Sequence, residues 1–112
     1  MSLNTLILTG NLGNDPRFLA TTSGRKKASF SVATSRSFKA ADGSKTTGTE
    51  WTPVVAWGSL ADRAEKLLAK GAYILVQGEK RTRTYTDSNG VLRSTVELVA
   101  ADFRLIAKKV TN

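Results

Sequence analysis

The chain has 112 residues, which is enough for one domain with a modest hydrophobic core. Its 17 Lys and Arg against 9 Asp and Glu give a formal charge of +8, which favours a polyanionic partner: nucleic acid first, an anionic membrane or acidic protein second. It has no Cys and no His, which excludes disulfides, thiolate chemistry, His-based triads and zinc sites of the usual Cys/His kind. Because no run could span a membrane and no signal segment is present, we expect a cytoplasmic protein.

The first half of the chain predicts three strands. "TLILTG" (5–10) is strongly β-prone and ends in glycine, and "ASFSVATS" (28–35) alternates apolar with small polar residues. "EWTPVVAWG" (50–58) is the third strand. The polar "FKAADGSKTTGTE" (38–50) carries the turn signal Asp42-Gly43, so we expect a loop or hairpin tip there.

Residues 59–70, "SLADRAEKLLAK", predict the only helix. Ser59 can cap its start, Asp62 suits its positive end, and Gly71 is expected to end it. Its apolar stripe recurs at helical spacing and consists of Leu60, Ala64, Leu67 and Leu68.

The second half predicts two long strands. "AYILVQGE" (72–79) continues into an extended hairpin arm at about 80–93, and a last strand at 92–107 is expected to bend near 100–102. The resulting order β-β-β-α-β-β fits a mainly β, five-stranded OB-fold barrel formed by one domain, residues 1–112. An SH3-like barrel or a ferredoxin-like sheet is less consistent, because the lone helix lies between the third and fourth strands.

Catalytic signals are weak. "GNLG" (10–13) matches neither the Walker pattern nor G-x-G-x-x-G, so we interpret it as a backbone turn. Asp62 and Glu65 share a helix face, but both lie among Arg63 and Lys66 on a solvated surface. We therefore expect no enzymatic activity, no cofactor and no metal.

The aromatic residues are more informative. Trp51 and Trp57 lie six positions apart in one strand, so alternation places both on the same face. They could belong to the core, but the opposite face of that strand already offers small apolar residues. Phe38 lies between Arg36 and Lys39. Rings interleaved with cations are typical of proteins that bind unpaired bases and the phosphates between them.

The hairpin arm shows the same combination. Arg81, Arg83 and Tyr85 alternate with three threonines, so they share one strand face that is both cationic and aromatic. We interpret this face as part of a groove for single-stranded nucleic acid. The alternative is an ordinary solvated hairpin.

Four blocks of the chain resemble the bacterial single-stranded DNA-binding proteins, the SSB family. They cover essentially the whole sequence in the family's order: "NTLILTGNLGNDP" (4–16), "FSVATSRSF" (30–38), "TEWTPVVAWGSLADRAEKLLAKG" (49–71) and "VQGEKRTRTYTDSNG" (76–90).

The resemblance implies an OB-fold protein, associated with the nucleoid, that protects single-stranded DNA in replication, recombination and repair. It also implies assembly as a homotetramer, with a dimer as the alternative. It implies stacking of bases on Phe38, Trp51, Trp57 and Tyr85. It also implies phosphate contacts from Lys39, Lys70, Arg81 and Arg83, to which composition alone adds Arg36 and Lys80.

The chain departs from the family at three points. Thr52 and Pro53 follow "EW", where members often have a polar or basic pair, which argues against a phosphate contact there. Phe38 and Tyr85 stand where other members have tryptophan, which predicts weaker stacking. Members usually continue into a flexible tail whose acidic tip recruits replication and repair proteins, whereas this sequence stops at Asn112 after the basic "AKKVTN". We therefore expect a tail-less or shortened form without those tail-mediated partners.

Two other functions fit parts of the pattern. A dimeric primosome accessory protein shares the OB-fold but acts mainly through protein contacts, and its relatives generally lack the full aromatic set. A structural or interaction domain would use the barrel for a protein or an oligosaccharide.

Overall fold

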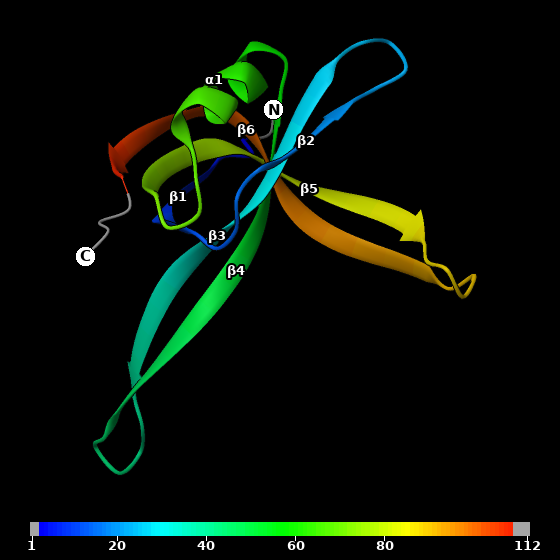
Figure 1. The fold of residues 1–112 in the computed structure, drawn as a ribbon. Helices are drawn as coiled ribbons and strands as arrows, with labels where there is room; N and C mark the ends of the chain where they lie inside the picture. Colours follow the sequence, from blue (N-terminus) through cyan, green and yellow to red (C-terminus); the bar gives the residue numbers. More distant parts are fainter. Residues whose placement is uncertain (1–2, 109–112) are drawn as a thin grey trace.

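A computed structural model describes residues 3–108 (Figure 1). The elements in chain order are β1 (Leu6–Leu12), β2 (Arg17–Ala20), β3 (Lys26–Lys39), β4 (Lys45–Trp57), α1 (Ser59–Leu67), β5 (Tyr73–Thr86) and β6 (Leu92–Ala107). Most of the basic "AKKVTN" end lies outside the described residues. No helix within residues 3–108 is both long and apolar enough to cross a membrane.

Five of the strands close into a barrel. The sheet runs β1-β5-β6-β4-β3, and β1 pairs with β5 along Leu6–Asn11 and with β3 at Asn11 and Leu12, which joins the two ends. The predicted mainly β, five-stranded barrel with one helix is therefore confirmed. The strand β2 was not predicted, and it pairs antiparallel with the outer edge of β3.

Closure of the barrel requires glycine at two positions. A Cβ atom at Gly10 would overlap the carbonyl oxygen of Ala33, and one at Gly78 would overlap that of Val99. Gly78 also lies at a register shift between β5 and β6, where the partner residue steps from Asp102 to Ala100. This bulge confirms the bend predicted in the last strand, since an extra residue on one strand kinks a sheet.

The core fills the barrel with alternate residues from each strand. Phe103, Ile74 and Leu98 are among the largest fully buried side chains. The helix contributes buried Ala61 and Ala64 to the same cluster. Burial of each large apolar side chain contributes about 1.5–3 kcal/mol to the hydrophobic stabilisation.

The helix begins differently from the prediction. The N-cap is Gly58, with φ of 62°, and no side chain caps the helix, so the prediction for Ser59 was wrong. The carbonyl of Gly58 instead accepts a hydrogen bond from the backbone N–H of Asp62, which lies in the first turn as expected.

The helix also ends earlier than residue 70. Leu68 adopts an extended conformation, with φ of −102° and ψ of 137°, and its side chain is buried in the core. Leu67 points outward and is 41% exposed, so Ala61 takes its place in the apolar stripe. Gly71 lies beyond the helix, where its N–H bonds to the carbonyl of Leu12.

Two hairpin arms extend from the barrel in different directions (Figure 1). The first is formed by β3 and β4, which pair without interruption as far as Lys39 and Lys45. The loop predicted at 38–50 is therefore only its central part, 40–44, where Asp42 accepts hydrogen bonds from the N–H and hydroxyl of Ser44. The second arm, formed by β5 and β6, pairs as far as Thr86 and Leu92 and confirms the arm predicted at 80–93.

Candidate nucleic-acid interface

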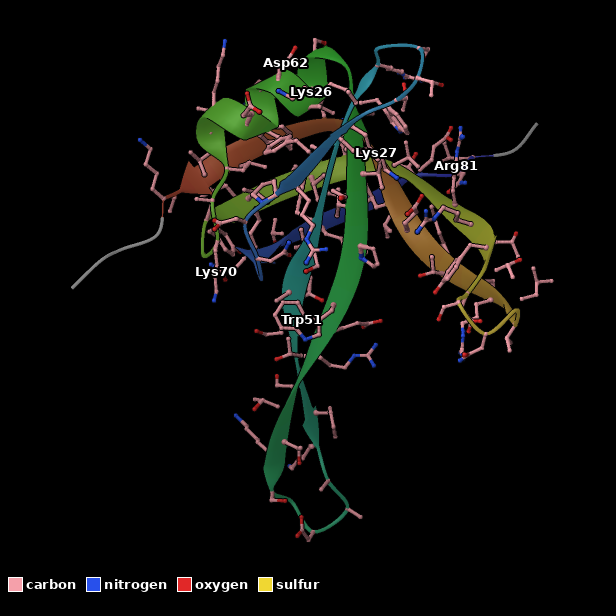
Figure 2. The ribbon with its side chains drawn as sticks, turned by 45° about the vertical axis from the view of Figure 1, so that its right-hand side comes forward. Lys26, Lys27, Trp51, Asp62, Lys70 and Arg81 are labelled. Atoms are coloured by element: carbon pink, nitrogen blue, oxygen red, sulfur yellow. The ribbon has the colours of Figure 1, made fainter. Side chains whose placement is uncertain are left out.

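The two tryptophans share the outer face of β4. The β3–β4 register is continuous from the Lys27–Trp57 pair to the Lys39–Lys45 pair, so side chains alternate strictly along both strands. Val54 and Ala56 are fully buried in the core, which leaves Trp51 and Trp57 facing outward as predicted. Trp51 is 56% exposed, and Figure 2 shows it on the β3–β4 ribbon below the barrel.

Trp57 lies in a more crowded environment than Trp51. It is partly buried. The guanidinium carbon of Arg25 lies 4.7 Å from the centroid of its ring, and Nζ of Lys27 lies 5.6 Å from it. Neither cation was predicted as a site residue, although the run "GRKK" at 24–27 and strand alternation could have indicated them.

The surface between the two tryptophans is slightly hollowed and combines serine hydroxyls with apolar side chains. Ser29 and Ser31 pair with Val55 and Pro53 in this part of the strand face. A shallow groove of about 230 Å³ lies here, lined by Asn14, Arg17, Ser29, Phe30 and Ser31.

The β3–β4 arm carries Phe38, Arg36 and Lys39. Phe38 is 52% exposed, and it lines a small cleft of about 310 Å³ with Arg36 and Glu50. The register places Phe38 and Arg36 on the face of the ribbon opposite Trp51, while Lys39 shares the face of Trp51. The structure therefore does not bring Phe38 and Trp51 together.

The β5–β6 arm confirms that Arg81, Arg83 and Tyr85 share one face, with the three threonines opposite. Tyr85 is 42% exposed, and the guanidinium of Arg83 lies 5.5 Å from its ring centroid. On the threonine side, β6 adds the exposed apolar residues Leu92 and Val96.

Carboxylates accompany the cations and the ring on this arm face, which the sequence analysis did not predict. Arg81 forms an ion pair with Glu79 at 2.8 Å, and Arg83 lies 3.8 Å from Glu97 of β6. Both side chains of the Arg81–Glu79 pair are more than half exposed, and such a surface pair contributes only about 0–1 kcal/mol. The Glu97 side chain beside Arg83 is only 13% exposed. The guanidinium of Arg81 can therefore exchange its carboxylate for a phosphate at little cost, whereas Arg83 stays close to Glu97.

Lys80 and Lys70 lie in different places. Lys80 lines a cleft of about 480 Å³ between the two arms, together with Trp51 and Val96. Lys70 follows the helix, and its backbone N–H donates to Asp15 over 2.8 Å. Figure 2 shows Lys70 on the opposite side of the molecule from Arg81.

The helix carboxylates are paired with a lysine. Nζ of Lys26 lies 3.2 Å from Asp62 and 2.8 Å from Glu65, and its hydrogen bond to Glu65 raises the pKa of Lys26 above the ordinary value. Within residues 3–108, no group of three or more acidic side chains could hold a metal ion.

Residues 3–106 match the model of the Single-strand binding protein family. The chain belongs to this family. It is 40% identical over 112 residues to "Single-stranded DNA-binding protein 1" of Xylella fastidiosa, covering 99% of this chain and 82% of that protein. It is 38% identical over 108 residues to the protein of the same name from Chlorobaculum tepidum, covering 96% of this chain and 67% of that one.

A solved structure of a family member has the same fold. The structure described as "Plasmodium falciparum SSB complex with ssDNA" superposes with a TM-score of 0.88 at 27% identity, covering 95% of this chain and 97% of the other. The barrel described above is accordingly the OB-fold expected from the order of elements.

Proposed function

We propose that this protein binds and protects single-stranded DNA without sequence preference, in replication, recombination and repair, and that it acts without catalysis. The observation that carries the proposal is the exposed indole of Trp51 on a strand face that also holds Lys27 and Arg25. Membership of the Single-strand binding protein family and the names of its relatives support it.

Binding combines two physical contributions. Bases stack on the exposed rings of Trp51, Phe38 and Tyr85, and in OB-folds that bind single strands such stacking contributes about 1–3 kcal/mol per base. Arginine and lysine side chains follow the phosphates: Arg36, Lys39, Lys70, Lys80, Arg81 and Arg83. A duplex hides its base faces, so stacking favours single strands.

The expected assembly is a homotetramer, with a dimer as the alternative. Support comes from β1, whose Leu6–Gly10 segment pairs with β5 on one side and has no strand partner on the other among the described residues. Ile7 in this segment is 57% exposed. An unpaired edge can accept the same edge of a second copy by two-fold symmetry. Light scattering with and without oligo-dT measures the oligomeric state.

Fluorescence anisotropy tests the function. Labelled oligo-dT, a mixed-sequence single strand and a duplex of equal length are each titrated with the protein. We expect similar affinity for the two single strands and much weaker binding to the duplex. Trp51→Ala should weaken single-strand binding, whereas Phe18→Ala, which removes an exposed ring from β2 facing Lys26, should not. Equal affinity for the duplex would refute the proposal, and so would unchanged binding by Trp51→Ala.

A further inference from the structure

Three consecutive cations at the start of β3 are divided between two faces of the sheet. Lys26 lies near the helix, where it pairs with Asp62 and Glu65. Arg25 and Lys27 lie over the ring of Trp57 instead. Figure 2 shows Lys26 beside Asp62 and Lys27 away from the helix, near the upper end of β4.

Lys26 differs from Arg25 and Lys27 in how far nearby carboxylates compensate its charge. Lys26 has two carboxylates within 3.2 Å. Arg25 and Lys27 form no ion pair with any residue in the range 3–108. Two uncompensated cations on one indole repel each other, and the cation–π attraction at a partly exposed site is only about 0.5–1 kcal/mol. An anion placed between them would relieve that repulsion.

The surface around Arg25 and Lys27 adjoins the surface around Trp51 on the same strand face. Lys27 pairs across the strands with Trp57 on one side and Leu19 of β2 on the other. The groove lined by Arg17, Ser29 and Ser31 separates this point from Trp51 along the same strand face. A single strand that stacks on Trp51 can therefore continue over the groove to Arg25 and Lys27.

We propose that Arg25 and Lys27 bind backbone phosphates of the single strand that passes Trp51, and that Trp57 positions them. The path of the DNA then runs along the outer face of β3 and β4 to the base of the β2–β3 hairpin. Because the cations already cover its ring, Trp57 acts through them more than by stacking on a base. This inference rests on the proposed function and adds a second anchoring point to it.

The salt dependence of oligo-dT affinity tests the proposal. Each phosphate neutralised on a single strand contributes about −0.7 to the slope of log K against log salt. Affinities are measured from 50 to 200 mM salt for Arg25→Ala, Lys27→Ala, the double variant and Lys26→Ala. Over this fourfold range, we expect the salt-induced loss of affinity to shrink about 2.6-fold in each single variant and about sevenfold in the double variant, relative to the parent. Lys26→Ala is the matched control, and its slope should equal the parent slope.

Two further variants separate positioning from stacking. Arg25→Lys keeps the charge and should restore the slope. Trp57→Leu removes the ring under both cations, so we expect the slope to fall toward that of the double variant. A salt-independent loss in Trp57→Leu would assign a stacking role to Trp57 and overturn its positioning role.

The outcomes for the proposal and for the function differ. If the parent binds oligo-dT and the double variant keeps the parent slope, Arg25 and Lys27 are not phosphate contacts, and the proposed function stands. If the parent fails to bind oligo-dT, both are wrong.

Discussion

The indole of Trp51 lies against the backbone of Gly13. A Cβ atom at position 13 would overlap Cζ3 of the ring and lie 2.8 Å from Cη2 and 2.9 Å from Cε3. Gly13 is not among the glycines with positive φ, so its backbone conformation is open to any residue. The glycine is needed because a side chain would occupy the space of the ring.

Gly13→Ala should therefore weaken binding through Trp51. The methyl group displaces the indole from its position on the strand face, so we expect a severalfold loss of oligo-dT affinity. In the Trp51→Ala background the same substitution should have no further effect, because the ring is already gone. A double-mutant cycle measures this coupling, and equal losses in both backgrounds would show that Gly13 acts independently of Trp51.

Two variants of the β5–β6 arm distinguish the contribution of base stacking from that of charge. Tyr85→Ala removes a ring and should cost about 1–3 kcal/mol of binding with little dependence on salt. Arg83→Ala removes a charge, so binding should fall mainly at low salt and the salt slope should shrink by a fraction of one ion, since Glu97 already compensates part of that charge. Affinities at two salt concentrations check both. If both variants bind like the parent, the arm is a solvated hairpin.

Acid should loosen the tip of this arm. The side-chain hydrogen bond from Arg93 and the backbone N–H of Val91 hold the pKa of Asp87 below its ordinary value. A lowered folded-state pKa stabilises the arm above the unfolded pKa, and this contribution is lost as pH falls below about 4, through the folded pKa. The protection of the Val91 amide against hydrogen exchange, relative to its intrinsic rate at each pH, should therefore fall over that range.

The other hairpin supplies a control for the acid experiment. Asp87→Asn should remove the pH dependence at Val91. Asp42→Asn alters the corresponding turn of the β3–β4 arm, where hydrogen bonds from Ser44 lower the pKa of Asp42. It should leave exchange at Val91 unchanged, and an equal effect of both variants would argue for global unfolding instead.

Arg63 should matter for stability and not for binding. Its guanidinium donates to the carboxylate of Asp102 and the carbonyl of Phe103, and it lies 4.4 Å from the Phe103 ring centroid. Arg63→Ala should destabilise the fold by about 0.5–1.5 kcal/mol, because the hydrogen bond to the part-buried carbonyl of Phe103 contributes on that order and the half-exposed pair with Asp102 adds little. Lys66→Ala, an exposed cation on the same helix, is the control in urea unfolding. Equal urea midpoints for Arg63→Ala and Lys66→Ala would contradict the role of Arg63 in stability.

The alternation of side chains between the two strand faces predicted the central strands well, because their pairing registers are regular. The shared face of Trp51 and Trp57 follows from the uninterrupted β3–β4 ladder. The sequence predicts a loop or hairpin tip over the outer part of that arm, because Lys45–Gly48 is polar and becomes a strand only through pairing with Arg36–Lys39. The short β2 has no buried residue that would mark it in the sequence.

The site was less predictable than the fold, because its partners come from distant segments. Glu97 lies opposite Arg81 only through the long-range pairing of β5 and β6, so the compensating acid beside Arg83 could not be found locally. The run "GRKK" marks Arg25 and Lys27 as cations in the sequence, but their contact with the ring of Trp57 follows only from the pairing of β3 with β4.

The most direct test is the fluorescence of Trp51 during a titration with oligo-dT. Trp57→Phe leaves Trp51 as the only tryptophan in the chain, so any change in emission reports on its ring alone. We expect saturable quenching by oligo-dT, with a midpoint that moves to higher concentration as salt is raised, and little quenching by a duplex of equal length. Emission that stays unchanged while oligo-dT binds, or that is quenched equally by the duplex, would contradict stacking of unpaired bases on Trp51.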